Sequence, residues 1–198
     1  MILFPPEAEW SPPTSFPDLT GQKEIAIDLE TCDPWLLSHG PGWAFKDRGY
    51  IIGIAVATEG WRGYFPVAHT TGANLDKDVV RRWLQKQLDA PNAKIFHNAQ
   101  YDVGWLKAEG YTINGEIHDT MMAAPLLNEN EYSYSLNSLG KTYLNEEKDE
   151  SMLTEAADVF GVNPKSEMYK LAPKYVGQYA EQDADLTYRL WQILKQGV

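Results

Sequence analysis

The chain has 198 residues, and 43% of them are hydrophobic, which is enough to bury the core of one globular domain. It has no apolar run of about 18 residues or more, no signal peptide at its start and a single cysteine, so we expect a cytoplasmic protein without membrane spans or internal disulfides. The net charge of −11 argues against a protein that holds long nucleic-acid duplexes by neutralising phosphates, because such a protein should be basic.

The first predicted strand carries two acidic side chains. Residues 1–22 are rich in proline and predict an extended N-terminal arm, and the alternating pattern of residues 24–30 predicts a strand. This alternation places Asp28 and Glu30 next to each other on one face. Two carboxylates this close raise a pKa unless a cation lies between them, so the pair is a candidate metal site.

The segments that follow predict alternating strands and helices. In chain order we expect a loop over 31–49, a β-hairpin of 50–58 and 61–67, a helix over 76–89, a strand over 94–97, helices over 98–106, 121–127 and 135–144, a charged loop over 145–150 and a helix over 152–160. Asp76 or Asn74, Asn98 and Asp119 are the expected N-caps of their helices. The charged loop predicts a solvated turn. This order favours an α/β fold with a mixed sheet flanked by helices, formed by one domain over residues 23–198.

The last predicted helix, over residues 175–196, carries an acidic residue within an apolar stripe. Tyr179 and Asp183 lie four residues apart, so they share the face that points to the core. A carboxylate in such a stripe is costly unless a cation or hydrogen bonds compensate it. We therefore expect divalent metal ions at Asp183, with further carboxylate ligands from earlier segments.

Three short motifs, taken in this order, resemble those of one nuclease superfamily. They are Asp28-Leu29-Glu30, Asn98-Ala99-Gln100-Tyr101-Asp102 and Tyr179-Ala180-Glu181-Gln182-Asp183. They resemble exonuclease motifs I, II and III of the DEDD superfamily, and a tyrosine four residues before the last aspartate is typical of its DEDDy branch. The resemblance is closest to the 3′–5′ proofreading exonuclease domain of family A DNA polymerases (the DNA polymerase I type, phage enzymes included) and covers about residues 23–195. It implies a ribonuclease H-like fold.

The resemblance also implies a mechanism and a set of site residues. Two divalent cations, Mg²⁺ or Mn²⁺, would support the removal of nucleoside 5′-monophosphates from the 3′ end of single-stranded DNA. The implied catalytic residues are Asp28, Glu30, Asp102, Tyr179 and Asp183, and the four carboxylates among them are the implied metal ligands. Tyr179 would orient the attacking water together with Glu30. The implied substrate-binding residues are Leu29, Thr31, Trp35, Asn98 and Tyr101.

Two alternatives to a DNA proofreading domain stay open. We expect a monomer that works with a DNA polymerase domain in cis or in trans, but an RNase D-like exoribonuclease that stands alone would carry the same motifs. The other alternative is a catalytically inactive nucleic-acid-binding module on the same fold. Asp185 is expected to be structural or solvated, and His97 and His118 are expected to be packed or at the surface, because hard cations prefer oxygen ligands.

Overall fold

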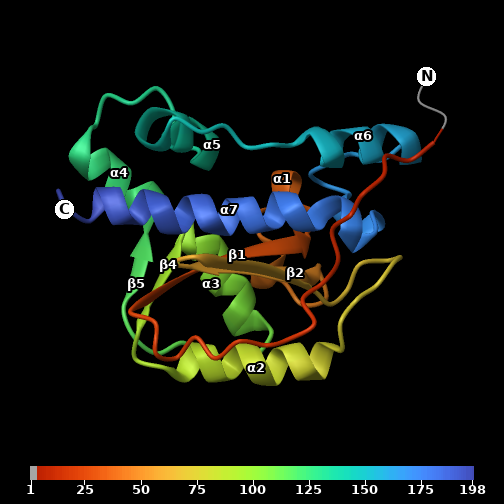
Figure 1. Cartoon of the computed structure of the whole chain (residues 1–198), viewed down its shortest axis with the longest axis horizontal. Coiled ribbons are helices and arrows are strands. Elements are labelled where there is room, and N and C mark those ends of the chain that lie inside the picture. The colour runs from red at the N-terminus through yellow and green to blue at the C-terminus, as the bar shows by residue number, and fades with distance from the viewer. Residues whose placement is uncertain (1–3) are drawn as a thin grey trace.

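The computed structural model describes residues 4–198, and their centre is one mixed sheet of five strands (Figure 1). The strands are β1 (Glu24–Cys32), β2 (Tyr50–Thr58), β3 (Trp61–Pro66), β4 (Ala93–Phe96) and β5 (Ile117–Asp119), in the spatial order β3-β2-β1-β4-β5. β2 is antiparallel to both β1 and β3, whereas β4 is parallel to β1 and β5 is parallel to β4. The predicted hairpin and the predicted mixed sheet are confirmed.

The edge strand β5 is absent from the sequence-based expectation, which has only a helix over 121–127 in this region. Residue Ile117 pairs with Lys94 and Asp119 pairs with Phe96, so the segment extends the sheet before the helix begins. A strand of three residues is too short for its alternation to stand out in a sequence, and pairing with β4 defines it. The strand places Asp119 beside the end of β4.

Helices cover both faces of the sheet. They are α1 (Leu36–His39), α2 (Lys77–Asp89), α3 (Ala99–Ala108), α4 (Thr120–Leu127), α5 (Leu136–Leu139), α6 (Ser151–Phe160) and α7 (Pro173–Leu194), with single turns at Gly42–Ala44, Gly140–Leu144 and Met168–Lys170. Figure 1 shows α7 lying along one face, with α4, α5 and α6 on its outer side and α2 across the opposite face. In the part of the chain that the structure describes, even α7 is too polar to cross a membrane.

The two faces of β1 differ in the size of their side chains. Ile25 and Ile27 point into the core that includes α2 and α3. Ala26 lies on the other face, where it packs with Leu186 and Leu190 of α7. A small side chain at this position lets the long helix lie close to the sheet. Asp28 and Glu30 continue the row that Ala26 begins, so strand geometry directs both carboxylates toward α7.

Helix α7 begins at Pro173. Backbone N–H groups in the first turn of a helix have no partner within the helix, so a proline there loses no hydrogen bond. The helix starts two residues before the predicted one and ends at Leu194. Its side chains toward the sheet are buried, as the apolar stripe predicts, and they include Tyr179 and Asp183, which are 7% and 6% exposed. The helix therefore carries an acidic group into the interior.

The described part of the N-terminal arm, residues 4–22, has no helix or strand and runs from α7 across to α2 (Figure 1); residues 1–3 of the predicted arm lie outside the described residues. Trp10 donates a hydrogen bond from Nε1 to Oε1 of Glu181 at 2.9 Å. Its ring lies against Gly177, where an added Cβ would come within 2.0 Å of it. Leu19 is buried in the core beside α2. These contacts fix the arm to the helix that carries Tyr179 and Asp183.

Candidate active site

Three carboxylates from two elements meet between β1 and α7. Asp28 and Glu30 come from alternate positions of β1, and Asp183 comes from the buried face of α7. One oxygen from each lies within 4.8 Å of the other two. Asp102, in the first turn of α3, lies outside this group of three, and its pKa is raised by burial and then by the charge of nearby Asp28. The structure thus brings together three of the four predicted metal ligands and sets the fourth beside them.

Burial makes this group of carboxylates electrostatically unfavourable on its own. Burial, and then the charge of Asp183, raises the pKa of Asp28 to about 8. The pKa of Glu30 is raised by burial and then by both aspartates. Oε1 of Glu30 and Oδ2 of Asp102 are buried without a hydrogen-bond partner in residues 4–198. Hard oxygen donors that lack a partner and crowd together fit a divalent cation such as Mg²⁺.

Lys148 partly neutralises the carboxylates, and the sequence-based expectation for its loop is wrong at this residue. Its Nζ lies 2.9 Å from Oδ1 and 3.0 Å from Oδ2 of Asp183, and its side chain is 12% exposed. The backbone around it is fixed, because Lys148 donates its N–H to Asn137 and Asp149 donates its N–H to Gln182 of α7. A lysine in a charged loop carries no periodic signal, so the sequence alone predicts a solvated turn.

Two ammonium groups bind the hydroxyl of Tyr179. Nζ of Lys148 donates to it at 3.0 Å and Nζ of Lys165 donates at 2.8 Å, and both ammonium groups lie over the ring. A phenol oxygen has two acceptor positions, so with both filled the hydroxyl can only donate. Burial, and then the nearby carboxylates, raises the pKa of Tyr179 well above its ordinary value. The residue is therefore a hydrogen-bond donor at neutral pH and cannot serve as a base.

Asn98 is the N-cap residue of α3, as predicted, but Asp119 supplies the capping bonds. The Asn98 side chain makes no capping bond, and its backbone is left-handed, with φ of 68°. Instead, Asp119 accepts the N–H groups of Asn98 and Ala99 at 2.9 and 2.8 Å. It also caps α4, as predicted, by accepting the N–H of Met121. One carboxylate thus fixes the start of α3, whose first turn carries Asp102.

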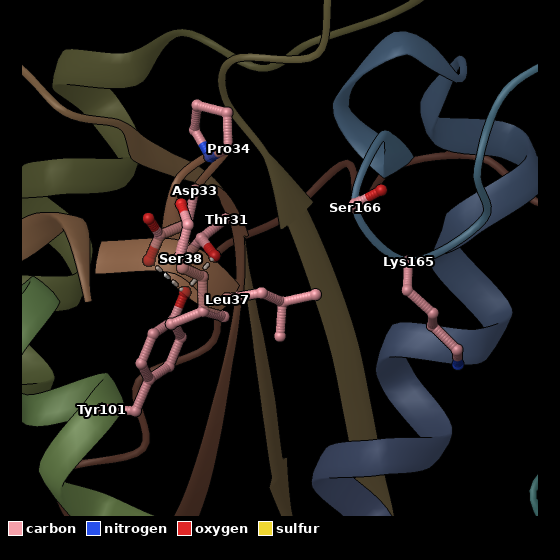
Figure 2. Close-up of a pocket in the computed structure, with 9 residues that line it drawn as sticks. Thr31, Asp33, Pro34, Leu37, Ser38, Tyr101, Lys165 and Ser166 are labelled. Atoms are coloured by element: carbon pink, nitrogen blue, oxygen red, sulfur yellow. Dashed lines mark hydrogen bonds between the residues drawn. The ribbon is translucent and has the colours of Figure 1, made fainter. Parts of the chain in front are cut away.

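A hollow of about 420 Å³ lies between the end of β1 with the loop after it and the turn that carries Lys165 (Figure 2). Thr31 and Tyr101 line it, and their hydroxyls are 2.8 Å apart. Tyr101 also donates to Oδ2 of Asp33 at 2.9 Å. On the opposite side, Lys165 connects the hollow to Tyr179. Tyr179 shares the buried face of α7 with Asp183, so the hollow lies near the acidic group on the side of Lys165.

The other predicted substrate-binding residues lie at different depths. Asn98 lines a neighbouring hollow that also includes Tyr101. Trp35 is 52% exposed, and its ring meets His39 edge-on rather than lining either hollow. Leu29 is 6% exposed and its side chain packs in the core, so it lines neither hollow.

Other polar residues singled out in the sequence have structural partners. Asp185 bonds to Arg189 at 2.9 Å and lies 3.5 Å from Arg62. His97 is close to Thr120, with 2.8 Å between Nδ1 and Oγ1, and His118 stacks on Trp191. None of these side chains belongs to the group of three carboxylates within residues 4–198.

The fold and its acidic group define a class of protein. A mixed five-stranded sheet, with carboxylates from its first strand facing a long C-terminal helix, is the DEDD exonuclease fold. The sequence matches the family described as 3′-5′ exonuclease over residues 16–198. The chain belongs to this family, and its relatives include the exonuclease regions of family A DNA polymerases, as the motifs indicate.

The similar sequences are DNA polymerases. A DNA-directed DNA polymerase of Pseudomonas phage M6 is 36% identical over 190 residues, which are 90% of this chain and 28% of that protein. DNA polymerase I of Pseudomonas aeruginosa is 30% identical over 191 residues, covering 87% of this chain and 20% of that protein. The chain therefore spans about a quarter of the length of such relatives.

Two of the similar solved structures show the shared fold. Brucella melitensis NrnC with bound Mg²⁺ superposes with a TM-score of 0.59 at 19% identity, over 90% of this chain and 75% of that one. Trypanosoma brucei RNase D superposes with a TM-score of 0.61 at 21% identity, over 89% of this chain and 58% of that one.

Proposed function

We propose that this exonuclease domain removes nucleoside 5′-monophosphates from the 3′ end of single-stranded DNA and proofreads for a DNA polymerase domain, in cis or in trans. The observation that carries the proposal is the group formed by Asp28, Glu30 and Asp183 beside a hollow of nucleotide size. The similarity to DNA polymerases of a phage and of a bacterium supports DNA as the substrate.

The carboxylates are suited to hold two divalent cations, Mg²⁺ or Mn²⁺. Asp28, Glu30 and Asp183 would be ligands, and Asp102 would complete the set from the side of Asp28. When bound, such ions stabilise the attacking and leaving oxygens of an in-line displacement and offset the charge of the phosphate. The Mg²⁺ in the structure of Brucella melitensis NrnC, which has the same fold, supports this choice of metal.

Glu30 and Tyr179 would orient the attacking water. Oε1 of Glu30 has no partner within residues 4–198, so it can accept a hydrogen bond from the water. The Tyr179 hydroxyl, whose acceptor positions are filled by two lysines, donates to the water oxygen. A water held at both ends presents a lone pair to phosphorus. Its oxygen forms the new P–O bond and loses a proton, the bond between phosphorus and the 3′ oxygen of the preceding nucleotide breaks, that oxygen takes up a proton, and the nucleoside 5′-monophosphate leaves.

The hollow would hold the terminal nucleotide. Thr31 and Tyr101 present hydroxyl groups to it, Leu29 contributes its backbone, and Asn98 contacts the strand from the neighbouring hollow. The exposed ring of Trp35 would stack on a base farther along the strand, an interaction that contributes about 1–3 kcal/mol. A small number of such contacts is enough to bind a frayed single strand, and it is compatible with a net charge of −11.

A direct assay separates this proposal from its alternatives. DNA and RNA strands of one sequence, labelled at the 5′ end, are incubated with the protein and Mg²⁺, with and without EDTA. The proposal predicts a ladder of shortened DNA, released 5′-mononucleotides and complete inhibition by EDTA. Asp183→Asn should abolish cleavage, whereas Asp185→Asn, two residues along the same helix, should retain it. Preference for RNA would favour the exoribonuclease, and a protein that binds strands without shortening them would be the inactive module.

A further inference from the structure

Lys165 lies at the boundary between the nucleotide-sized hollow and the carboxylates. Together with Ser166 it forms one side of the hollow, opposite Thr31, Leu37 and Tyr101 (Figure 2). Its ammonium is also 2.8 Å from the Tyr179 hydroxyl and 4.2 Å from the centre of the Tyr179 ring. A nucleotide in the hollow with its phosphate directed at the carboxylates would therefore pass this ammonium.

The backbone that carries Lys165 is held in place. Oδ1 of Asn163 accepts the N–H groups of Lys165 and Ser166, both at 3.0 Å. Oε1 of Glu167 in turn accepts the N–H of Asn163 at 3.0 Å. The turn is therefore fixed by its own side chains, and what can move is the lysine side chain.

The two lysines at Tyr179 differ in their freedom to meet a ligand. Lys148 is largely buried and held by Asp183, whereas the side chain of Lys165 is 47% exposed. Lys165 has a second partner, Glu150, at 2.7 Å, and the Glu150 side chain is 41% exposed. An ion pair this exposed contributes little to stability, so an incoming anion can replace Glu150 at small cost.

Among the described residues that line the hollow, Lys165 carries the single cationic side chain, and Asp33 carries an acidic one. We propose that Lys165 is the phosphate-binding residue of this hollow: its ammonium leaves Glu150 for a non-bridging oxygen of the 3′-terminal nucleotide's phosphate. The inference rests on the proposed function and names one contact that selects a nucleotide over a nucleoside. A charge-assisted hydrogen bond of this kind would also hold the scissile bond against the carboxylates.

The test measures binding and turnover separately. Lys165→Met keeps the length of the side chain and removes its charge, and Lys165→Arg restores a cation. Lys170→Met is the matched control, because Lys170 is also about half exposed, pairs with an acidic residue, Glu167, and lies over a tyrosine ring, but does not line the hollow. Calorimetry with Mg²⁺ gives the Kd of thymidine 5′-monophosphate and of thymidine, and degradation of oligothymidylate gives KM and kcat.

Lys165→Met should raise the Kd of thymidine 5′-monophosphate and the KM of the strand by about tenfold. The Kd of thymidine should stay within about twofold, and Lys165→Arg and Lys170→Met should behave like the unmodified protein. Unchanged binding of the monophosphate, or equal weakening of both ligands, would overturn the assignment. A fall in kcat at constant KM would instead show that Lys165 acts only through Tyr179, and would overturn it too.

A second variant keeps the test decisive if Lys165→Met is unstable. Glu150→Gln removes the anion that competes for the ammonium, so it should tighten binding of thymidine 5′-monophosphate, and weaker binding would contradict the proposal. Failure of the unmodified chain to shorten any strand would defeat the proposed function. Normal shortening with unaltered monophosphate binding in both variants would defeat the role of Lys165 alone.

Discussion

Nζ of Lys148 lies 2.9 Å from Oδ1 of Asp183, so a lysine from the loop before α6 serves as an internal counter-ion for the acidic group. The pair is largely buried on both sides, with side chains that are 12% and 8% exposed. The metal-free protein thus offsets part of the repulsion among Asp28, Glu30 and Asp183.

Lys148→Met should destabilise the metal-free protein strongly. Removing one partner of a buried pair leaves an uncompensated charge and typically costs about 3–5 kcal/mol. Lys141→Met is the matched control, because the pair of Lys141 with Glu147 is exposed and screened by solvent, so its loss should change stability little. The same loss of positive charge should tighten Mg²⁺ binding. Urea unfolding with EDTA and calorimetry with Mg²⁺ check the two effects, and equal stability losses for both variants would contradict the assignment.

Asp28→Asn should stabilise the metal-free protein at alkaline pH. The pKa of Asp28 is raised to about 8 by burial and by Asp183, from 3.8 in the unfolded chain. Between these values the folded state binds more protons, so stability falls as pH rises from about 4 to about 8, and asparagine removes this loss. The advantage of the variant over the unmodified protein in urea unfolding with EDTA should grow across that range. A constant difference at all pH values would refute the explanation.

Replacement of His69 should remove a loss of folding stability that occurs as the pH falls, whereas Asp28→Asn removes a loss that occurs as the pH rises. Burial lowers its pKa to about 4, while Nδ1 donates to the carbonyl of Leu171 and Nε2 accepts from the Tyr64 hydroxyl. The unfolded chain binds the extra proton below about 6.5, so this histidine's contribution is complete above that pH and declines toward pH 4. In His69→Gln this decline should be absent. Plots of the free energy of unfolding against pH for the variant and the unmodified protein should therefore converge as the pH is lowered. Parallel curves would count against it.

Asp119→Ala should cost more stability than loss of an ordinary helix cap. Asp119 caps both α3 and α4, whereas Asp76 caps only α2. Loss of one cap costs about 1 kcal/mol, so we expect roughly 2 kcal/mol for Asp119→Ala and roughly 1 for Asp76→Ala. Urea unfolding compares them. Equal losses would show that one of the two helix ends does not depend on Asp119.

The parts of the site that depend on the regular spacing of side chains along a strand or a helix could be predicted from the sequence. Strand alternation puts Asp28 beside Glu30, and helical spacing puts Tyr179 on the face of Asp183, so the structure places both pairs as the patterns indicate. The resemblance to known exonucleases identified the family.

Contacts made by loops and by distant residues could not be predicted in this way. Lys148 and Lys165 reach Tyr179 from irregular segments 31 and 14 residues away, and no periodicity marks them. Asp119 caps a helix that starts about 20 residues earlier, an arrangement that depends on the parallel pairing of β4 and β5. The positions of Lys148, Lys165 and Asp119 therefore depend on tertiary contacts, which the local sequence pattern does not show.

We infer that carboxylates from β1, α3 and α7 form a divalent-metal site. Anomalous diffraction from crystals of the protein soaked in Mn²⁺, with data collected near the manganese edge, would locate bound ions directly. Anomalous density is expected among the side chains of Asp28, Glu30 and Asp183, with a second peak on the side of Asp102. Density that is absent there at saturating Mn²⁺, or found only elsewhere on the protein, would contradict it.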